Sequence, residues 1–319
     1  TVRKIPTYET TGVQGQEQNK NLIFNDGDPA KTPVTPDASR PATFVDANGQ
    51  PIIGNSVPAT SNGQSVGTYE LDPNTGQVTF KPNKNFVGTP DPVTVQVNDS
   101  NGVPYRAHYK PTVTKVTPTG TNATSTGPQG VPQTGTPSFQ GGDPLVPIDE
   151  TVDPTFEDGS KEKSIPGQGT YTIAPDGTVT FTPDKQFVGN PEPVTVKRLD
   201  KNGTPVTATY SPEFTKVTPT GTNATSTGPQ GVPQTGTPTF QGGDPLVPID
   251  ETVEPTFADG SKEKSIPGQG TYTIAPDGTV TFTPDKQFVG NPDPVTVKRV
   301  DKNGTPVTAT YTPTVTKVT

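Results

Sequence analysis

The residue types that carry most enzyme chemistry are nearly missing from this sequence. Its 319 residues include no cysteine and one histidine, His108. Without cysteine the chain has no thiolate nucleophile, disulfide or thiolate metal site, and the sequence contains no glycine-rich phosphate loop. The counterparts of His108 in two later copies of a repeated unit are Thr209 and Thr310. We therefore expect His108 to be a solvated side chain and the chain not to be an enzyme.

Carboxylates gather in one part of the second copy and raise the question of a calcium site, because calcium prefers oxygen ligands. The six are Asp143, Asp149, Glu150, Asp153, Glu157 and Asp158. Their spacing lacks the alternation of a calcium-binding loop, so we favour structural or solvated acids over a calcium site. Asp176 and Asp200 stand at turn positions, where aspartate serves the backbone. We assign no catalytic, cofactor-binding or metal residue, and the ligand-binding residues stay unidentified.

Two short segments are similar to the Leu-Pro-x-Thr-Gly signal by which sortases anchor proteins. They are Val131-Pro-Gln-Thr-Gly135 and Val232-Pro-Gln-Thr-Gly236. A working signal is followed by an apolar segment and a basic tail, whereas here Thr136 and more of the repeat follow. We therefore do not expect these segments to act as anchors.

The composition favours strands over helices. Apolar residues make up 26% of the chain, against roughly 45% in an ordinary domain, so disorder is the competing interpretation. The apolar residues are mainly valine with phenylalanine, isoleucine and tyrosine, which favour strands, and 41 prolines interrupt any long helix. The formal charge of -8 gives no basic surface for nucleic acid, and no apolar run approaches the ~20 residues of a membrane span. Since Thr1 opens without a signal peptide, we expect a segment of a longer chain.

The chain is a tandem array, because residues 118–218 recur almost unchanged as residues 219–319. Residues 1–117 form a divergent, longer first repeat, with its extra residues mainly between Asp28 and Thr68. We place the second repeat at 118–218, with an extended N-terminal junction at 118–136, and the third at 219–319. The passage from Lys115 to Gly127 is expected to be extended and weakly structured. Eight positions differ between the last two repeats: Ser138/Thr239, Asp153/Glu254, Glu157/Ala258, Glu192/Asp293, Leu199/Val300, Ser211/Thr312, Glu213/Thr314 and Phe214/Val315.

Two hairpins are predicted in each repeat. In the second repeat, residues 169–183 alternate Tyr171, Ile173, Val179 and Phe181 with threonines around a Pro-Asp-Gly turn. Residues 193–210 place valines on both sides of Asn202-Gly203, and Asn-Gly is a strong hairpin signal. Phe187 and Val188 are expected to plug the end of the sandwich, and residues 145–148 and 151–156 to add one or two strands. The pattern predicts an all-β fold of tandem small β-sandwich (Ig-like) domains arranged as an elongated array.

The hairpin residues also carry a family likeness. The segments are Gly169-Thr-Tyr-Thr-Ile-Ala-Pro-Asp-Gly-Thr-Val-Thr-Phe-Thr-Pro-Asp-Lys-Gln-Phe-Val-Gly189, Pro193-Val-Thr-Val196 and Lys201-Asn-Gly-Thr-Pro-Val-Thr-Ala-Thr-Tyr210. They resemble the CshA-type fibril repeat of streptococcal surface adhesins, over the second and third copies and over the first from about Gly67. The resemblance implies a cell-wall-anchored extracellular fibril, a role in host colonisation or biofilm, and repeats that act as its stalk.

Two functions compete at this point. One is a structural stalk that projects an adhesive region from the cell wall, with the neighbouring repeats of a monomeric chain as its partners. The alternative is that each repeat is a weak, multivalent module for a host matrix protein such as fibronectin, or for other bacteria. Exposed aromatic residues would favour the alternative, and the candidates are Phe139, Phe156, Phe187 and Phe214. Because their neighbours are apolar, we expect these rings to be buried.

Overall fold

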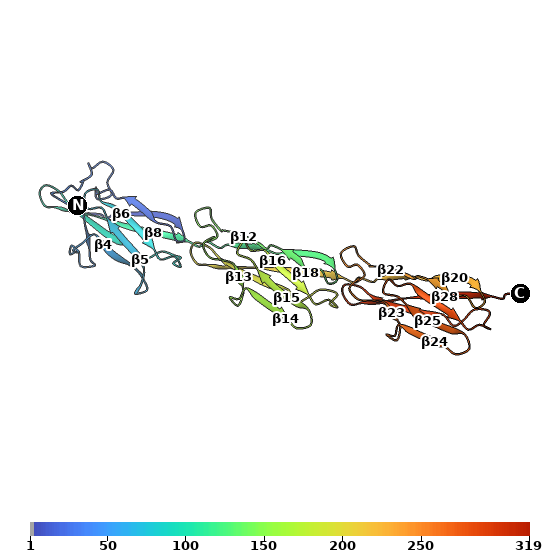
Figure 1. Cartoon of the computed structure of the whole chain (residues 1–319). Helices are drawn as coiled ribbons and strands as arrows, with labels where there is room; N and C mark the ends of the chain where they lie inside the picture. Colours follow the sequence, from blue (N-terminus) through green and yellow to red (C-terminus); the bar gives the residue numbers. More distant parts are fainter. Residues whose placement is uncertain (1–2) are drawn as a thin grey trace. The chain divides into compact units, whose positions relative to one another are not determined.

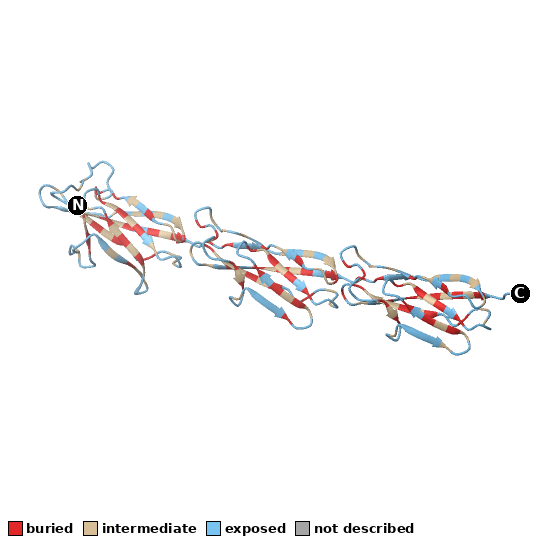
Figure 2. Ribbon diagram, viewed as in Figure 1, coloured by how far each residue is buried: buried red, intermediate tan, exposed pale blue. Residues whose placement is uncertain are grey.

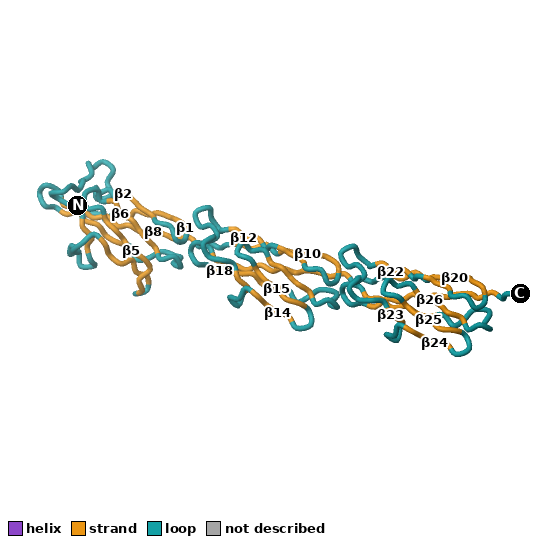
Figure 3. Tube along the Cα trace, in the orientation of Figure 1, coloured by secondary structure: helices purple, strands orange, loops and turns teal. Residues whose placement is uncertain are grey.

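The computed structural model describes residues 3–319, which form strands and loops without a helix (Figure 3). Within these residues, no helix is available that is long and apolar enough to cross a membrane. Contacts divide the chain into two compact units. Unit 1 comprises Thr1–Thr121, Ser138–Pro154 and Lys197–Ala208, and unit 2 comprises Asn122–Pro137, Thr155–Val196 and Thr209–Thr319. Segments of the second repeat therefore belong to both units.

The first repeat lies in unit 1 and folds as two four-stranded sheets, ordered β1-β8-β7-β3 and β2-β6-β5-β4. Its strands are β1 (Thr7–Val13), β2 (Gln18–Asn21), β3 (Thr43–Val45), β4 (Ser56–Ser61), β5 (Gln64–Leu71), β6 (Gln77–Pro82), β7 (Val93–Asn98) and β8 (Pro104–Thr114) (Figure 1). The extra residues of this repeat form the loops around β3 and the longer β4–β5 hairpin, as the spacing predicts.

The later repeats use ten strands each. In the second they are β9 (Thr119–Thr121), β10 (Ala123–Pro128), β11 (Gln133–Gly135), β12 (Ser138–Gln140), β13 (Thr155–Phe156), β14 (Glu162–Ile165), β15 (Gly169–Ile173), β16 (Val179–Pro183), β17 (Val194–Leu199) and β18 (Pro205–Thr215). In the third they are β19 (Thr220–Thr222), β20 (Ala224–Pro229), β21 (Gln234–Gly236), β22 (Thr239–Gln241), β23 (Thr256–Phe257), β24 (Glu263–Ile266), β25 (Gly270–Ile274), β26 (Val280–Pro284), β27 (Val295–Val300) and β28 (Pro306–Thr316). The third repeat has the sheets β20-β28-β27-β23 and β21-β26-β25-β24, so the prediction of an all-β tandem array is confirmed.

Both predicted hairpins are present with the predicted faces. In the second repeat Tyr171 pairs with Phe181 and Ile173 with Val179, and all four side chains are buried. In the third repeat β27 and β28 are antiparallel, with Val295 opposite Tyr311. Figure 2 shows the resulting alternation of buried and exposed residues along these strands. The period of two in the sequence therefore corresponds to one face on the core and one face in water.

In each repeat the earliest strand of one four-stranded sheet pairs in parallel with the last strand of the repeat. The pairs are β1 with β8, β10 with β18 and β20 with β28. The expectation of a weakly structured passage at residues 115–127 is therefore wrong for most of its length, because β9 and most of β10 lie within it. The strand at the sheet edge contains few apolar side chains, so its threonine, glycine and proline residues do not show the alternation that predicts a strand.

Two local expectations also differ from the structure. Residues 145–148 form isolated bridges rather than a strand, and Leu145 is 64% exposed. Val188 does not plug the sandwich, since it is 42% exposed, whereas Phe187 lies half-buried with its ring 6.2 Å from the Phe214 ring. In a short apolar pair next to a turn, one side chain reached the core and its neighbour pointed away.

Aromatic side chains fill much of each small core. Tyr171 contacts Phe181 and Tyr210 at ring distances of 4.5 and 6.3 Å, and Phe181 contacts Phe214 at 5.5 Å. Phe156 and Phe214 are each 1% exposed, while Phe139 is half-buried. Large rings bury enough area to hold a core together where apolar residues are few. The expectation of buried rings is confirmed in full for Phe156 and Phe214.

The difference between Phe214 and Val315 predicts unequal core stability. Val315 is 1% exposed and stands where the second repeat has a phenylalanine packed on two other rings. We expect Val315→Phe to stabilise the third repeat by about 1–2 kcal/mol, because it restores buried ring contacts. Denaturant unfolding followed by NMR signals of each repeat would measure this change.

Thr312→Ser is the matched control for that substitution, since it also converts a third-repeat residue to its second-repeat counterpart without adding a ring. If Val315→Phe destabilised the third repeat, the ring would be overpacking a core that has adapted to valine.

Candidate functional site

His108 is held in the first repeat rather than solvated, which corrects the sequence expectation. It is half-buried on β8, and its Nδ1 lies 2.6 Å from the Thr94 hydroxyl on β7. Its backbone N–H donates to the Pro6 carbonyl at 2.8 Å. Burial lowers the pKa of His108 below its usual value. The side chain thus makes a cross-strand contact between β7 and β8.

The acidic residues of the second repeat support turns and ion pairs. Asp149 accepts hydrogen bonds from the backbone and hydroxyl of Thr151 and pairs with Lys201 at 3.3 Å. Glu150 pairs with Arg198 at 3.2 Å. Asp143 and Asp158 each accept a backbone N–H two residues ahead, as Asp176 and Asp200 also do. Within residues 3–319, His, Cys, Asp and Glu form no group of three suited to a metal ion.

The last three residues of the anchor-like segment, Gln133–Gly135, are built into the sheet as β11. Gln133 is 8% exposed, and a Cβ at Gly135 would collide with the ring of Tyr210. The same holds for Gln234, Gly236 and Tyr311 in the third repeat. Packing against the last strand thus accounts for the glutamine and glycine of this motif, without a role as a sortase signal.

Gln133 belongs to a buried hydrogen-bond relay that we call the tyrosine clamp. The Ser125 hydroxyl on β10 donates to Gln133 Oε1 at 2.5 Å and lies 2.5 Å from the Tyr210 hydroxyl on β18. Because serine has one hydroxyl proton and gives it to Gln133, Tyr210 donates to Ser125. Gln133 Nε2 then donates to the carbonyl of Glu213 at 2.9 Å. The relay thus begins and ends on β18 and passes through β10 and β11.

Equivalent clamps occur in the other repeats. The first uses Thr10, Gln18, Tyr109 and the carbonyl of Thr112, and the third uses Ser226, Gln234, Tyr311 and the carbonyl of Thr314. Burial raises the pKa of the hydroxyls of Tyr109, Tyr210 and Tyr311. A tyrosine that keeps its proton keeps its role as donor, so the relay is stable over the whole neutral range.

A second glutamine closes the carboxyl-terminal corner of each repeat. Gln129 Nε2 donates to the carbonyl of Lys185 at 2.9 Å, and its Oε1 accepts the N–H of Val217 at 3.1 Å. Gln14 holds Lys84 and Val116 in the same way, and Gln230 holds Lys286 and Val318. We call Gln14, Gln129 and Gln230 the corner glutamines.

Two of the corner glutamines, Gln14 and Gln129, also accept a hydrogen bond from the Asn-Gly turn of the following repeat. Within unit 1, Asn202 Nδ2 donates to the carbonyl of Gln14 at 2.9 Å. Within unit 2, Asn303 Nδ2 donates to the carbonyl of Gln129 at 2.9 Å. Asn303 is 6% exposed, so the asparagine of this turn is buried. The hairpin asparagine therefore has a second task as a joint between consecutive repeats.

A glycine beside each corner glutamine lets the turn approach. Gly15 and Gly130 have φ of 82°, and a Cβ on either would collide with the side-chain oxygen of Asn202 or Asn303. Gly231 has φ of 77°, and a Cβ there would meet no atom within 4 Å. All three glycines have a left-handed backbone, which favours glycine at each position. Only Gly15 and Gly130 also need the missing side chain so that an asparagine can approach.

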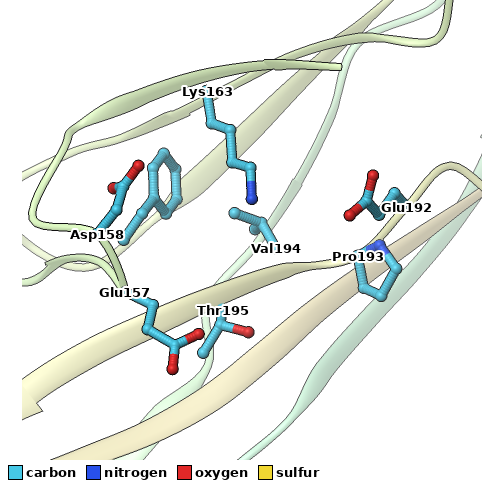
Figure 4. Close-up of a pocket in the computed structure, with 8 residues that line it drawn as sticks. Glu157, Asp158, Lys163, Glu192, Pro193, Val194 and Thr195 are labelled. Atoms are coloured by element: carbon cyan, nitrogen blue, oxygen red, sulfur yellow. The ribbon is translucent and has the colours of Figure 1, made fainter. Parts of the chain in front are cut away.

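One cavity in unit 2 is shallow and polar. It has a volume of about 460 Å³ beside β13 and β17, and it is lined by Phe156, Glu157, Asp158, Lys163, Glu192, Pro193, Val194 and Thr195. Figure 4 shows Lys163 extending over Val194, with Asp158 and Glu192 on either side. In the third repeat Ala258 replaces Glu157 and Asp293 replaces Glu192. Two of only eight differences therefore fall on this lining, which argues against a ligand site shared by both repeats.

Sequence reasoning missed the corner glutamines and the clamp glutamines. The near-identical second and third repeats conceal them, because almost every residue is retained there. The divergent first repeat contains the available signal, since Gln14, Gly15 and Gln18 keep the spacing of Gln129, Gly130 and Gln133 while the residues between them change.

The chain matches one known protein family and one solved repeat at high sequence identity. The model of the surface adhesin CshA repetitive domain matches residues 4–113, 115–214 and 216–315. The NMR structure of repeat domain 13 of the fibrillar adhesin CshA from Streptococcus gordonii is 92% identical, over 24% of this chain and 97% of that one, with a TM-score of 0.15. No curated protein matches the chain significantly.

Similar solved structures include tandem domains of other proteins. Mouse cadherin-23 EC22-24 is 14% identical over 99% of this chain and 96% of that one, with a TM-score of 0.35. The I9-I11 tandem from titin is 10% identical over 99% of this chain and 98% of that one, with a TM-score of 0.34.

The lowered pKa of His108 predicts an acid-sensitive first repeat. The unfolded chain binds the proton more readily, so stability is full above about pH 6.5 and falls as the pH drops through and below that value. We expect His108→Thr, the residue of the later repeats, to flatten the pH dependence of first-repeat unfolding between about pH 7 and 5. Thermal unfolding resolved by repeat would measure it, and equal slopes for both proteins would contradict the assignment.

The joint geometry predicts different costs for two similar substitutions. Gly130→Ala and Gly231→Ala impose the same backbone strain, but only the first meets the asparagine of the next repeat. We expect Gly130→Ala to raise the amide exchange rate of Asn303 by roughly tenfold, corresponding to about 1–2 kcal/mol for the lost contact. Hydrogen exchange by NMR gives the measurement, with Gly231→Ala as the control. Equal effects of the two substitutions on Asn303 would exclude the joint.

Proposed function

The chain belongs to the family of surface adhesin CshA repetitive domains, and from this premise we propose that it is a structural stalk segment of a bacterial cell-surface adhesin. Membership of the family places these repeats on an extracellular, fibrillar adhesin. The stalk carries an adhesive region of the parent protein away from the cell wall, to which the parent is anchored. The three repeats proposed at 1–117, 118–218 and 219–319 act as its beads.

The observation that carries this proposal is the joint between consecutive repeats. Each joint uses one carbonyl from a corner glutamine and one asparagine side chain from an Asn-Gly turn. A chain of freely linked beads does not need a buried asparagine at the link, whereas a spacer that resists collapse does. The joint thus favours a stalk whose reach exceeds that of flexibly tethered domains.

Side-chain differences between the repeats support the same function. A binding module repeated for avidity keeps its recognition residues, but the cavity lining at Glu157 and Glu192 changes in the third repeat. The clamp and corner side chains do not change, and the last acceptor of the clamp is a backbone carbonyl, that of Glu213 in one repeat and Thr314 in the next. The internal support is therefore retained where the cavity lining is not.

A second candidate function concerns the first repeat alone. A cavity of about 540 Å³ lies in its extra loops, lined among others by Pro41, Pro51, Ile52 and Pro73, and Ile53 is fully exposed at its edge. An exposed isoleucine beside an apolar hollow is typical of a contact with another protein. A host matrix protein such as fibronectin, or the surface of another bacterium, is the partner that this candidate requires.

Small-angle X-ray scattering tests the stalk. A disordered chain of this length gives a radius of gyration near 64 Å and a compact globule one near 20 Å, and we expect a value between them, about 35 Å. A value near either limit would contradict the stalk.

Binding of the same 319-residue chain to immobilised fibronectin and to bacterial cells separates the two functions. The stalk predicts no binding, and the second candidate predicts binding that Ile53→Ser abolishes. Val152→Ser, at an exposed apolar residue of the second repeat, is the matched control.

A further inference from the structure

The direction of the terminal strands decides how a repeat responds to tension. In the third repeat β20 is the edge strand of its sheet and pairs in parallel with β28. The register runs from Ala224 opposite Tyr311 to Pro229 opposite Thr316. The short strand β19 comes first in the chain, which then enters this four-stranded sheet at the amino end of β20 and leaves the repeat at the carboxyl end of β28. In a parallel pair these two points lie at opposite ends.

We propose that this parallel pair is the load-bearing element of each repeat. Tension along the chain pulls β20 and β28 in opposite directions along their own axes, so their hydrogen bonds are loaded together. In an antiparallel hairpin pulled at its two free ends, the same bonds would open one after another. The proposal rests on the stalk function for its biological meaning, but the geometry on which it depends is independent of that function.

Side-chain hydrogen bonds reinforce the pair along its length. At one end Thr310 N–H donates to Asn223 Oδ1 at 2.8 Å, and at the other the Thr316 hydroxyl donates to the carbonyl of Gly228 at 3.2 Å. The tyrosine clamp of Ser226 and Tyr311 lies between them. Gln230 N–H extends the ladder by donating to the carbonyl of Thr316 at 2.8 Å. Each bond is modest alone, but sliding the strands breaks them at once.

Other pairings in the repeat do not bear the load in the same way. β19 pairs with β22 over three positions, Thr220 to Thr222, against six positions in the β20–β28 pair. It is therefore the weaker barrier on the path. The sheet β21-β26-β25-β24 contains neither the entering nor the leaving strand. Its hydrogen bonds are loaded only after β20 has parted from β28.

Single-molecule force spectroscopy on the 319-residue chain tests the proposal. Because the sequence has no cysteine, one cysteine added at each end gives unique attachment points. Full extension of the second or third repeat adds roughly 30 nm, and the longer first repeat adds a few nanometres more, so the first is recognised by its length. We expect three high-force events, with the second and third repeats nearly equal in force.

A matched pair of tyrosine substitutions locates the resistance. Tyr311 and Tyr272 are both fully buried, and each donates one hydroxyl hydrogen bond, to Ser226 and to the carbonyl of Asp293. We expect Tyr311→Phe to lower the force of one of the two equal events by about a third and Tyr272→Phe to leave both unchanged, since forced unfolding follows the unfolding barrier and not total stability. Equal effects of the two substitutions would overturn the proposal.

A change of pulling direction provides a test without any loss of hydrogen bonds. Thr222 and Thr308 are exposed and lie near each other, because the neighbouring Gly221 approaches the carbonyl of Thr308. Attachment through cysteines at these two positions peels β20 from β28 instead of shearing it. We expect the unfolding force of the third repeat to fall several-fold. A force equal to that of end-to-end pulling would refute the load-bearing pair, whereas the stalk function itself would fail in the scattering experiment.

Discussion

Each repeat depends on fixing an early, apolar-poor strand, which is β1, β10 or β20, to its last strand. β10 carries alanine, threonine, serine, glycine and proline, so it brings little hydrophobic area to the core. The tyrosine clamp holds β10 in place by hydrogen bonds instead. They run from Tyr210 through Ser125 and Gln133 to the Glu213 carbonyl. Donors in a buried chain of this kind strengthen one another, and none of them is left without a partner. The parallel pair, the closing of the sandwich and the position of the corner glutamines all follow from it.

The corner glutamines extend this support across the repeat boundary. The side chain of Gln129 is hydrogen-bonded to the backbone of Lys185 and Val217, which fixes the corner where one repeat ends and the next begins. Its backbone carbonyl is then presented to Asn303 at a fixed place. Internal folding and joint formation thus share a residue, so that a well-formed repeat is also a prepared partner for its neighbour.

The hairpins could be predicted from the sequence, whereas the early, apolar-poor strand and the joints could not. The buried face of the first hairpin could be predicted because apolar residues alternate with polar ones along it. Its apolar residues are Tyr171, Ile173, Val179 and Phe181, and all four are buried. β10 and β11 are stabilised by hydrogen bonds of Ser125 and Gln133, and polar side chains that are satisfied inside a protein look like loop residues in a sequence. The aspartates at turns were correctly interpreted because that role is local, while the second role of Asn202 depends on a partner 188 residues away.

The shared chemistry of the joints has a consequence for inheritance. Both joints use the same two groups, the carbonyl of a corner glutamine and the side chain of an Asn-Gly turn. Their glycines are alike, although the first repeat differs widely in sequence from the second. Recombination between near-identical copies therefore adds or deletes whole repeats without creating a mismatched boundary. The number of repeats becomes a trait that selection can adjust in single steps, with no new interface to evolve.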